Sequence, residues 1–501
     1  MNPTFLPYNL SRQPERKHVQ LLIAPDARTG EYWYENLKYW LGDPASLYWF
    51  SDWETLPYDQ YTPHPDLIAE RLRVLAELPT RTHGIVIASA AALRQRLCPQ
   101  THLDKYGIHL AVGDHLARDV LIQRLIDAGY QRNPHHISGK GEYAARGNII
   151  DLYPMNATDP IRLEWLDDDV DSIRTFAVAD QRTLEKREHI SILPRSELDL
   201  SDAGRICYRQ NARLHYGEKI VNSPLYQQIS EGKTPQGLEY YLPLFYDDTA
   251  TLFDYLPKNS QVLVCDDLPA LLARHASWCE QRYQRTNPLR ENRLLPPDAL
   301  WLTPEETLAR LAALPPVPYK ERATALPFSG DEGERDQQWR TYIIEQEGNI
   351  TLHFPSKGSC EWWQNSLSAP FGVGKETFSK LHFVVSPNRH SFRDGDAVHL
   401  AEANLHTIQV EQNHRHNRSR DPAALIRSLQ DLSPGTAVVH ADFGVGRYLG
   451  LEKLEEDGDE LIAIAYAKGA KLYVPTADID LITRYGGSDP DSAPLHELGG
   501  K

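Results

Sequence analysis

This 501-residue chain has few cysteines, and they are widely spaced in the sequence. No C-x-x-C pair occurs among its five cysteines, which are Cys98, Cys207, Cys265, Cys279 and Cys360. Scattered cysteines argue against a disulfide framework and a zinc site, and they fit a reducing compartment. The histidines at 135–136 and at 414 and 416 lack cysteine or carboxylate partners at ligand spacing. We therefore predict no metal site.

Long apolar runs are also missing. No stretch of about 18 apolar residues occurs, so we expect no membrane-spanning segment and no membrane partner. The first residues, MNPTFLPYNLSRQPERK, lack the apolar core of a signal peptide. We expect a cytoplasmic protein.

A third absence is the phosphate-binding loop of nucleotide hydrolases. That loop needs G-x-x-x-x-G-K-[ST] after a strand, so that backbone N–H groups, a lysine and a hydroxyl can hold the phosphates and Mg²⁺. After its first predicted strand the chain has APDARTGEYW, and FGVGKET at 371–377 lies in the wrong region. We therefore predict no catalytic site and no cofactor in this chain.

The bulk composition is that of a globular protein with several domains. It is 41% hydrophobic and 24% charged, and its length predicts roughly three or four domains. The net charge of −16 argues against nucleic-acid affinity over the whole surface. A basic stretch, NHRHNRSR at 413–420, is either a local nucleic-acid contact or, as we favour, a charged linker.

The first 315 residues predict an α/β domain that is interrupted by a second module. Buried-strand runs at 19–25, 46–50 and 84–90 enclose a helix pattern that starts near Asp66, which is typical of a parallel sheet. From 105 to 198 polar alternation and turns predict an inserted α+β module, and QVLVC at 261–265 returns to the α/β texture. The aromatic segment 52–72 is either a base-stacking platform or, as we favour, a packed loop.

The remaining residues predict smaller pieces. A stretch rich in Pro, Gly and charge, 315–338, predicts a linker. Strands at 349–354 and 382–386 around a short helix predict a small α/β region. Short strands at 437–440, 446–454, 460–466 and 471–475 predict an SH3/Tudor-like β-barrel. The fold class is therefore multidomain, α/β and α+β, with a small C-terminal barrel.

The segments GEYAARGNIIDLYP, at 141–154, and IRLEWL, at 161–166, carry the most information. Alternation sends Ile161, Leu163 and Trp165 to the core and leaves Arg162, Glu164 and Leu166 on the other face. Arg146 lies on the preceding strand. Two guanidiniums beside a large apolar side chain favour a protein-docking surface. Ordinary solvated sheet stays open as the alternative, because single exposed apolar residues are common.

The strand 460–466 is apolar on both faces. Leu461, Ala463 and Ala465 alternate there with Ile462, Ile464 and Tyr466. A small barrel covers one face, so the other face or the strand's edge is available to a partner strand. Coverage by the preceding domain stays open as the alternative.

Several long segments, in order, resemble bacterial transcription-repair coupling factors. They are DWETLPYDQYTPHPDLIAERL, GEYAARGNIIDLYP, IRLEWLDDDVDSIRTFAVADQRT, GLEYYLPLFYDDTATLFDYLP, VVHADFGVGRYLGLEKL, KLYVP and LITRYGG. The resemblance implies a degenerate helicase-like α/β domain, an inserted UvrA-binding module and an RNA polymerase-interacting barrel. The implied boundaries are 1–116 and 199–315 for the two halves of the α/β domain, 117–198 for the insert, 316–339 for a linker, 340–411 for a small α/β domain, 412–432 for a basic linker and helix, 433–486 for the barrel and 487–501 for a tail.

The resemblance also implies partners and contact residues. Arg146, Arg162 and Leu166 match the UvrA-binding positions, although the family often has an aromatic residue at the last of these. Leu461, Ile462 and Ile464 lie on the strand matched to RNA polymerase β-subunit binding. The family's ATP- and Mg-dependent DNA translocase modules follow the barrel, and this chain ends before them. We expect a monomeric docking platform. The rival hypothesis, a stand-alone UvrB-like damaged-DNA-binding protein, predicts a DNA-inserting hairpin that the sequence lacks.

Overall fold

The computed structural model describes most of the chain in two compact units, residues 1–409 and 410–501, which we treat separately. The described residues are 3–13, 16–42, 46–59, 61–134, 137, 139–178, 182–264, 267–289, 293–326, 328, 332–368, 373–404, 435, 437–440, 444–453, 460–475, 482–484 and 495. The predicted basic stretch, the helix expected after it and the histidines at 135–136 and at 414 and 416 lie outside these ranges.

The first unit contains the parallel sheet that the sequence predicts. Its order is β12-β1-β3-β2, with β1 at Val19–Ala24, β2 at Leu47–Phe50, β3 at Gly84–Ser89 and β12 at Gln261–Val264. All neighbouring strands are parallel. Every residue of β1, β2 and β3 is buried, which explains why these strands are continuous apolar runs.

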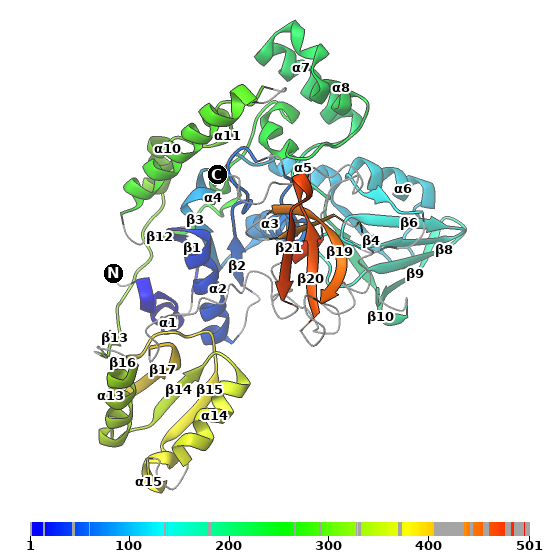
Figure 1. The fold of residues 1–501 in the computed structure, drawn as a ribbon. Helices are drawn as coiled ribbons and strands as arrows, with labels where there is room; N and C mark the ends of the chain where they lie inside the picture. Colours follow the sequence, from blue (N-terminus) through cyan, green and yellow to red (C-terminus); the bar gives the residue numbers. More distant parts are fainter. Residues whose placement is uncertain are drawn as a thin grey trace. The chain divides into compact units, whose positions relative to one another are not determined.

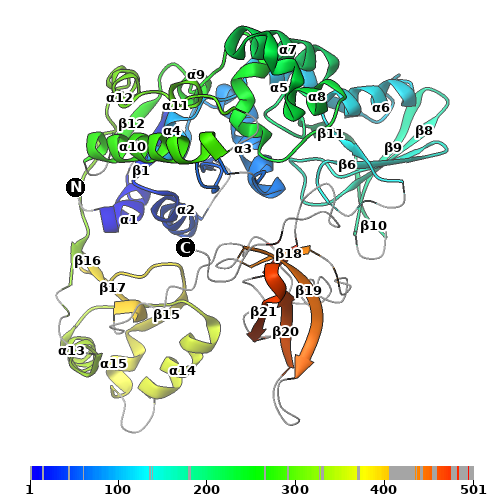
Figure 2. The ribbon, with the colours of Figure 1, turned by 45° about the horizontal axis from the view of Figure 1, so that its top comes forward.

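Helices cover both faces of this sheet (Figure 2). On one face α1, Leu6–Ser11, and α2, Ala27–Leu41, pack against Leu22 and Ile87. On the other face α3, Pro65–Glu77, and α10, Leu268–Thr286, share a core with Leu21 and Val86. The described residues of this domain also form the α-helices α4 (Ala90–Arg94), α5 (Gln100–Tyr106), α7 (Asp202–Tyr216), α8 (Pro224–Ser230), α9 (Leu252–Tyr255), α11 (Pro297–Leu300) and α12 (Pro304–Ala312), and several 3₁₀ helices, of which η4 (Leu238–Phe245) is the longest.

The inserted module is built on a six-stranded sheet of order β10-β9-β8-β7-β6-β5 (Figure 1). The strands are β5 (Gln131–Arg132), β6 (Glu142–Arg146), β7 (Ile149–Leu152), β8 (Ile161–Leu166), β9 (Asp169–Phe176) and β10 (Thr183–Arg187). Helix α6, Arg118–Asp127, buries Leu121 and Leu125 in the shared core. At the base of the module β4, Ile108–Ala111, pairs with β11, His189–Ile192.

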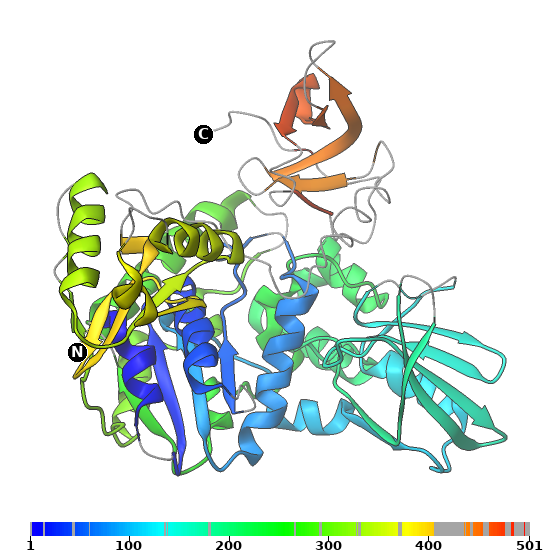
Figure 3. The same ribbon diagram turned by 90° about the horizontal axis from the view of Figure 1, so that it is seen from below.

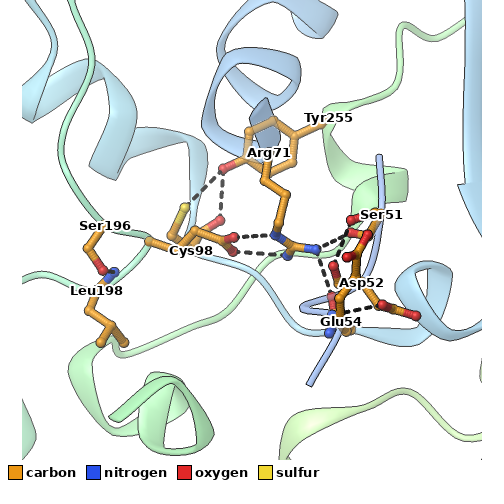
Figure 4. A network of polar contacts seen from close by, with 10 residues as sticks. Ser51, Asp52, Glu54, Arg71, Cys98, Ser196, Leu198 and Tyr255 are labelled. Atoms are coloured by element: carbon orange, nitrogen blue, oxygen red, sulfur yellow. Dashed lines mark hydrogen bonds and ion pairs between the residues drawn. The ribbon is translucent and has the colours of Figure 1, made fainter. Parts of the chain in front are cut away.

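A buried charge joins this module to the α/β domain (Figure 4). Arg71 of α3 donates from Nε to Glu197 Oε1 at 2.6 Å and from Nη1 to the Gln95 Oε1 at 2.8 Å and the Ser51 carbonyl at 2.5 Å. Helix α3, in blue, lies between the first sheet and the inserted module (Figure 3). Because Glu197 follows β11 in sequence, this ion pair anchors the end of the insert to its host.

The small α/β domain has a five-stranded sheet of order β13-β16-β17-β14-β15. Its elements are β13 (Thr324–Ala325), α13 (Glu332–Glu345), β14 (Ile350–Phe354), α14 (Lys357–Ser368), α15 (Lys375–Ser379), β15 (Leu381–Val385), β16 (Phe392–Asp394) and β17 (Ala397–Ala401). The segment predicted as a linker, 316–339, therefore includes a strand and half a helix. Because the composition of this segment is that of a linker, the sequence analysis did not assign Trp339 to a core, although its side chain is fully buried in the core of this domain.

The second unit contains an antiparallel sheet of order β21-β20-β19-β18-β22. The strands are β18 (Ala437–His440), β19 (Gly444–Lys453), β20 (Glu460–Ala465), β21 (Lys471–Pro475) and β22 (Ile482–Arg484). Among the residues described in this unit, no pairing joins β21 to β22. The structure thus shows an open sheet, and the closed barrel stays a prediction.

None of the helices in the described ranges combines the length and the apolar character needed to cross a bilayer.

Candidate docking face

The register of the inserted sheet defines which side chains share its outer face. Across β6, β7, β8 and β9, one row pairs Arg146 with Ile149, Ile149 with Glu164 and Glu164 with Ser172. Directly opposed residues of antiparallel strands lie on the same face, so these side chains form one row. The next row is made by Ala144, Asp151, Arg162 and Arg174.

The inner face is the hydrophobic core that the sequence predicts. Ile161, Leu163 and Trp165 are all buried. The Trp165 indole N–H donates to the Leu116 carbonyl at 2.8 Å, so even its polar atom is satisfied internally. The alternation on β8 therefore fixes Arg162, Glu164 and Leu166 on the outer face.

Arg162 is held by a neighbouring carboxylate. Its Nε and Nη2 donate to the two oxygens of Asp151 at 2.6 and 2.9 Å, and its guanidinium lies 4.9 Å from the centroid of the Phe176 ring. The hydrogen bond to Asp151 raises the pKa of Arg162. Asp151 is only 5% exposed, so the pair is part of the fold. The sequence analysis named no partner for Arg162, because a strand read alone does not reveal the carboxylate on its neighbour.

A second ion pair on this face escaped the sequence analysis. Arg174 of β9 pairs with Glu164, which also accepts a hydrogen bond from Ser172 Oγ at 3.0 Å. The only available signal was the alternation of charged residues on two successive strands. The centre of the face is thus neutral and preorganised.

Arg146 and Leu166 are the exposed members of the predicted set. Leu166 is 67% exposed at the end of β8, and Arg146 is exposed at the end of β6. Among the described residues, none forms an ion pair or hydrogen bond with the Arg146 side chain. The structure thus leaves one guanidinium and one large apolar side chain available for a partner.

Two hairpin tips bring these residues to the same end of the sheet. The backbone N–H of Trp165 donates to the Asn148 carbonyl at 3.0 Å, and the side-chain Nδ2 of Asn148 donates back to the Trp165 carbonyl at 3.1 Å. The Arg118 Nη1 donates to the Gly147 carbonyl at 2.7 Å. The turn after Arg146 is therefore fixed against the residue that precedes Leu166.

An acidic turn borders this face. Asp167 and Asp168 link β8 to β9, Asp169 is the first residue of β9, and all three are exposed. His115 Nδ1 lies 2.7 Å from Asp169 Oδ1, and this hydrogen bond raises the pKa of the histidine. The face therefore offers a cation, an apolar contact and an anionic rim within one module.

The aromatic segment 52–72 is packed, as favoured from the sequence. Trp53 and Tyr58 are buried, and the Tyr58 hydroxyl donates to the Leu295 carbonyl at 2.9 Å. Both rings contact Tyr240 of η4. These rings are therefore not available for stacking on bases.

The turn between β1 and α2 is occupied by protein groups. The Asp26 carboxylate caps α2 by accepting a hydrogen bond from the Thr29 N–H at 2.8 Å. A Cβ atom on Gly30 would lie 2.3 Å from the Trp49 ring, so that ring fills the space beside the first helical turn. A carboxylate at a helix N-terminus competes with any phosphate for the same N–H groups.

The strand β20 does not offer the free edge that was expected. It pairs with β19 on one side and with β21 on the other. Ile462 and Ile464 are both fully buried in the core of the second unit, with Tyr448 and Val474. Leu461 is half-buried. The two isoleucine side chains are therefore core residues, and a charge at either position would unfold the sheet.

Comparisons with known proteins match both units. Residues 108–198 match the family model "UvrB interaction domain", and residues 432–486 match "CarD-like/TRCF RID domain". A transcription-repair-coupling factor of Haemophilus influenzae is 35% identical over 97% of this chain, and that of Escherichia coli is 34% identical over 96%. The Bacillus subtilis protein is 28% identical over 87%. The chain spans 45%, 44% and 40% of the lengths of these relatives.

Proposed function

Because this chain resembles transcription-repair-coupling factors along nearly its whole length, we propose that it is a docking platform that connects RNA polymerase with excision repair. The inserted module binds UvrA, and the second unit binds the polymerase β subunit. The observation that supports UvrA docking most strongly is the exposed Arg146 and Leu166 at the joined hairpin tips. They lie within the residues matched by the UvrB interaction domain model.

The physical argument for docking rests on desolvation. Arg162 with Asp151 and Arg174 with Glu164 are already paired, so a partner does not have to neutralise them. Leu166 contributes apolar area, and Arg146 offers a guanidinium for a carboxylate of the partner. The outer face can therefore be covered without leaving an unmatched charge.

Gel filtration of the chain with purified UvrA tests this assignment. We expect the wild-type chain to co-elute, and Arg146→Glu or Leu166→Glu to abolish co-elution, since a central contact is worth about 2 kcal/mol or more. Matched controls are Arg124→Glu and Ile126→Glu on α6, an exposed cation and an exposed apolar residue on the helix that covers the inner face. Co-elution of the Arg146 and Leu166 variants at wild-type level would remove UvrA docking from this face.

Polymerase binding is assigned to the second unit, which matches the RID model. Leu461 is the contact residue we retain, because its side chain is half-exposed on β20. Ile462 and Ile464 support the contact only by holding the strand in place. Closure of this sheet into a barrel belongs to the same proposal.

ATP hydrolysis, Mg²⁺ binding and DNA translocation are assigned to segments of the relatives that this chain does not cover. The Asp26 carboxylate accepts a hydrogen bond at the N-terminus of α2, which supports the proposal that no nucleotide phosphate binds at the β1–α2 turn. We propose that the chain acts as a monomer.

The rival hypothesis, a stand-alone UvrB-like damaged-DNA-binding protein, is less well supported. It predicts a DNA-inserting hairpin that the sequence lacks, and Trp53 and Tyr58, which could otherwise stack on bases, are buried. A fluorescence titration with damaged duplex DNA separates the two hypotheses. Tight binding without UvrA would favour the rival.

A further inference from the structure

Two buried histidines lie where the small domain meets the α/β domain. His353 of β14 and His399 of β17 are 1% and 6% exposed. His353 Nε2 lies 3.0 Å from His399 Nδ1, and His353 Nδ1 lies 2.7 Å from Ser386 Oγ. These contacts form a polar chain inside the protein.

Aromatic side chains of the α/β domain close over this pair. The Trp40 ring of α2 lies 5.5 Å from the His353 ring and 5.3 Å from the His399 ring, between centroids. Tyr8 of α1 lies 5.4 Å from His399. The histidines therefore face the other domain and not their own domain's helices.

Hydrogen bonds from α1 complete the contact. The Tyr8 hydroxyl donates to Asp394 Oδ2 at 3.1 Å. The Asn9 side-chain oxygen accepts from the backbone N–H groups of Arg322 and Ala323 at 3.0 and 2.9 Å. Helix α1 therefore contacts both the segment that leads into the small domain, at residues 322–323, and strand β16 of its sheet.

The pair is built for neutral imidazoles. Among the described residues, no carboxylate hydrogen-bonds to either ring, and His399 Nε2 is buried without a hydrogen-bond partner. A proton added there would have no acceptor, and its charge would be enclosed by aromatic rings. Burial, with a smaller contribution from the neighbouring His399, lowers the pKa of His353 to about 3. Burial, with a smaller contribution from the Arg12 charge, lowers the pKa of His399 to about 4.

The other ionisable groups around the pair are few. Among the described residues, the titratable and charged groups around it are Tyr8 of α1, Arg12 directly after α1, Tyr39 of α2, Asp394 of β16, and Arg389 and His390 in the loop before β16. Asp394 is engaged by Arg322 at 3.1 Å and by Tyr8, so its charge is already matched.

We propose that the small domain is latched to the α/β domain by this neutral histidine pair, and that protonation of the pair opens the latch. The closed latch keeps the small domain and the α/β domain as one body. Opening it would separate β14 and β17 from Trp40 and Tyr8 while both domains stay folded. The inference does not depend on UvrA or polymerase binding.

Hydrogen exchange of the whole chain at pH 7 and pH 5, corrected for intrinsic rates, tests the latch. For each of the two histidines, a pKa near 6.5 in the open latch and well below 5 in the closed latch predicts a loss of protection of roughly 30-fold at pH 5. We expect the loss at the backbone N–H groups of Arg322 and Ala323, which donate to Asn9 across the junction, and not in β1 or β3 of the first sheet. Unchanged protection of these two N–H groups would overturn the proposal.

Variants of the pair keep the test sharp. His353→Gln with His399→Asn retains polar atoms near the two contacts and removes both titrations, so its protection should not change between pH 7 and pH 5. His353→Gln or His399→Asn alone keeps one of the two titrations, so its loss of protection between pH 7 and pH 5 should be roughly 30-fold smaller than that of the wild-type chain. If the double variant does not fold, these single variants decide, and a loss as large as that of the wild-type chain would overturn the proposal.

Discussion

At the residue scale, Arg162 combines folding with surface chemistry. Its bidentate ion pair with Asp151 satisfies a carboxylate that is almost fully buried. We predict that Arg162→Ala lowers the free energy of unfolding by about 2 kcal/mol, because it leaves that carboxylate without a partner. Urea unfolding measures this loss, with Arg146→Ala as the control that should change stability by less than about 0.5 kcal/mol. Equal stability of the two variants would contradict the structural role of Arg162.

Glu239 gives a pH-dependent prediction at the same scale. It is buried on η4 with one carboxylate oxygen unpartnered, and burial raises its pKa to about 7. Because the folded pKa lies above the unfolded one, the group's stability contribution is present at pH 4 and is lost as the pH rises through 7. We expect the free energy of unfolding of Glu239→Gln, measured in urea at pH 8, to exceed that of the wild-type chain by about 2–3 kcal/mol. This difference should disappear as the pH is lowered towards 4. A variant that is equally stabilised at both pH values would argue against a protonated Glu239.

The residue scale also shows where sequence reasoning ends. Alternation placed Ile161, Leu163 and Trp165 inside and Leu166 outside, because the period of a strand is a local property. The pairing of Arg162 with Asp151 depends on the register between β7 and β8, which the sequence of a single strand does not reveal. The sequence therefore predicted which side chains of β8 face outward but not their ion pairs, and their role in binding a partner stays a prediction.

At the element scale, the buried strands β1, β2 and β3 were predictable because continuous apolar runs occur when both faces are covered. Helix α13 was not, because its first turns are charged and, among its described residues, only Trp339 and Ile343 are fully buried. The role of β20 was also misjudged, since an apolar strand looks the same at an edge and in the centre of a sheet.

The two faces of β20 predict different mutant behaviour. We expect Ile464→Glu to unfold the second unit, since it puts a charge into the core with Tyr448 and Val474. Leu461→Glu should keep the fold and weaken capture of the polymerase β subunit at least about tenfold, about 1.4 kcal/mol. Circular dichroism and a pull-down with the isolated β subunit distinguish the two effects. Wild-type capture by folded Leu461→Glu would argue against Leu461 as the contact.

At the scale of the whole molecule, two junctions within the first unit are made by buried polar contacts. Arg71 holds the inserted module to its host, and the His353–His399 pair faces Trp40 at the small domain. Both junctions combine residues far apart in sequence, so neither could be predicted from local patterns. In the proposed function, the junction through Arg71 fixes the module that carries the docking face to its host domain.

The most direct test is hydrogen exchange of the chain alone and with saturating UvrA. The proposed function predicts slower exchange in β6 and β8, with the turn that follows each, and unchanged exchange in α6 on the inner side of the same module. Protection confined to α6, or none anywhere in residues 108–198, would contradict the claim that this outer face binds UvrA.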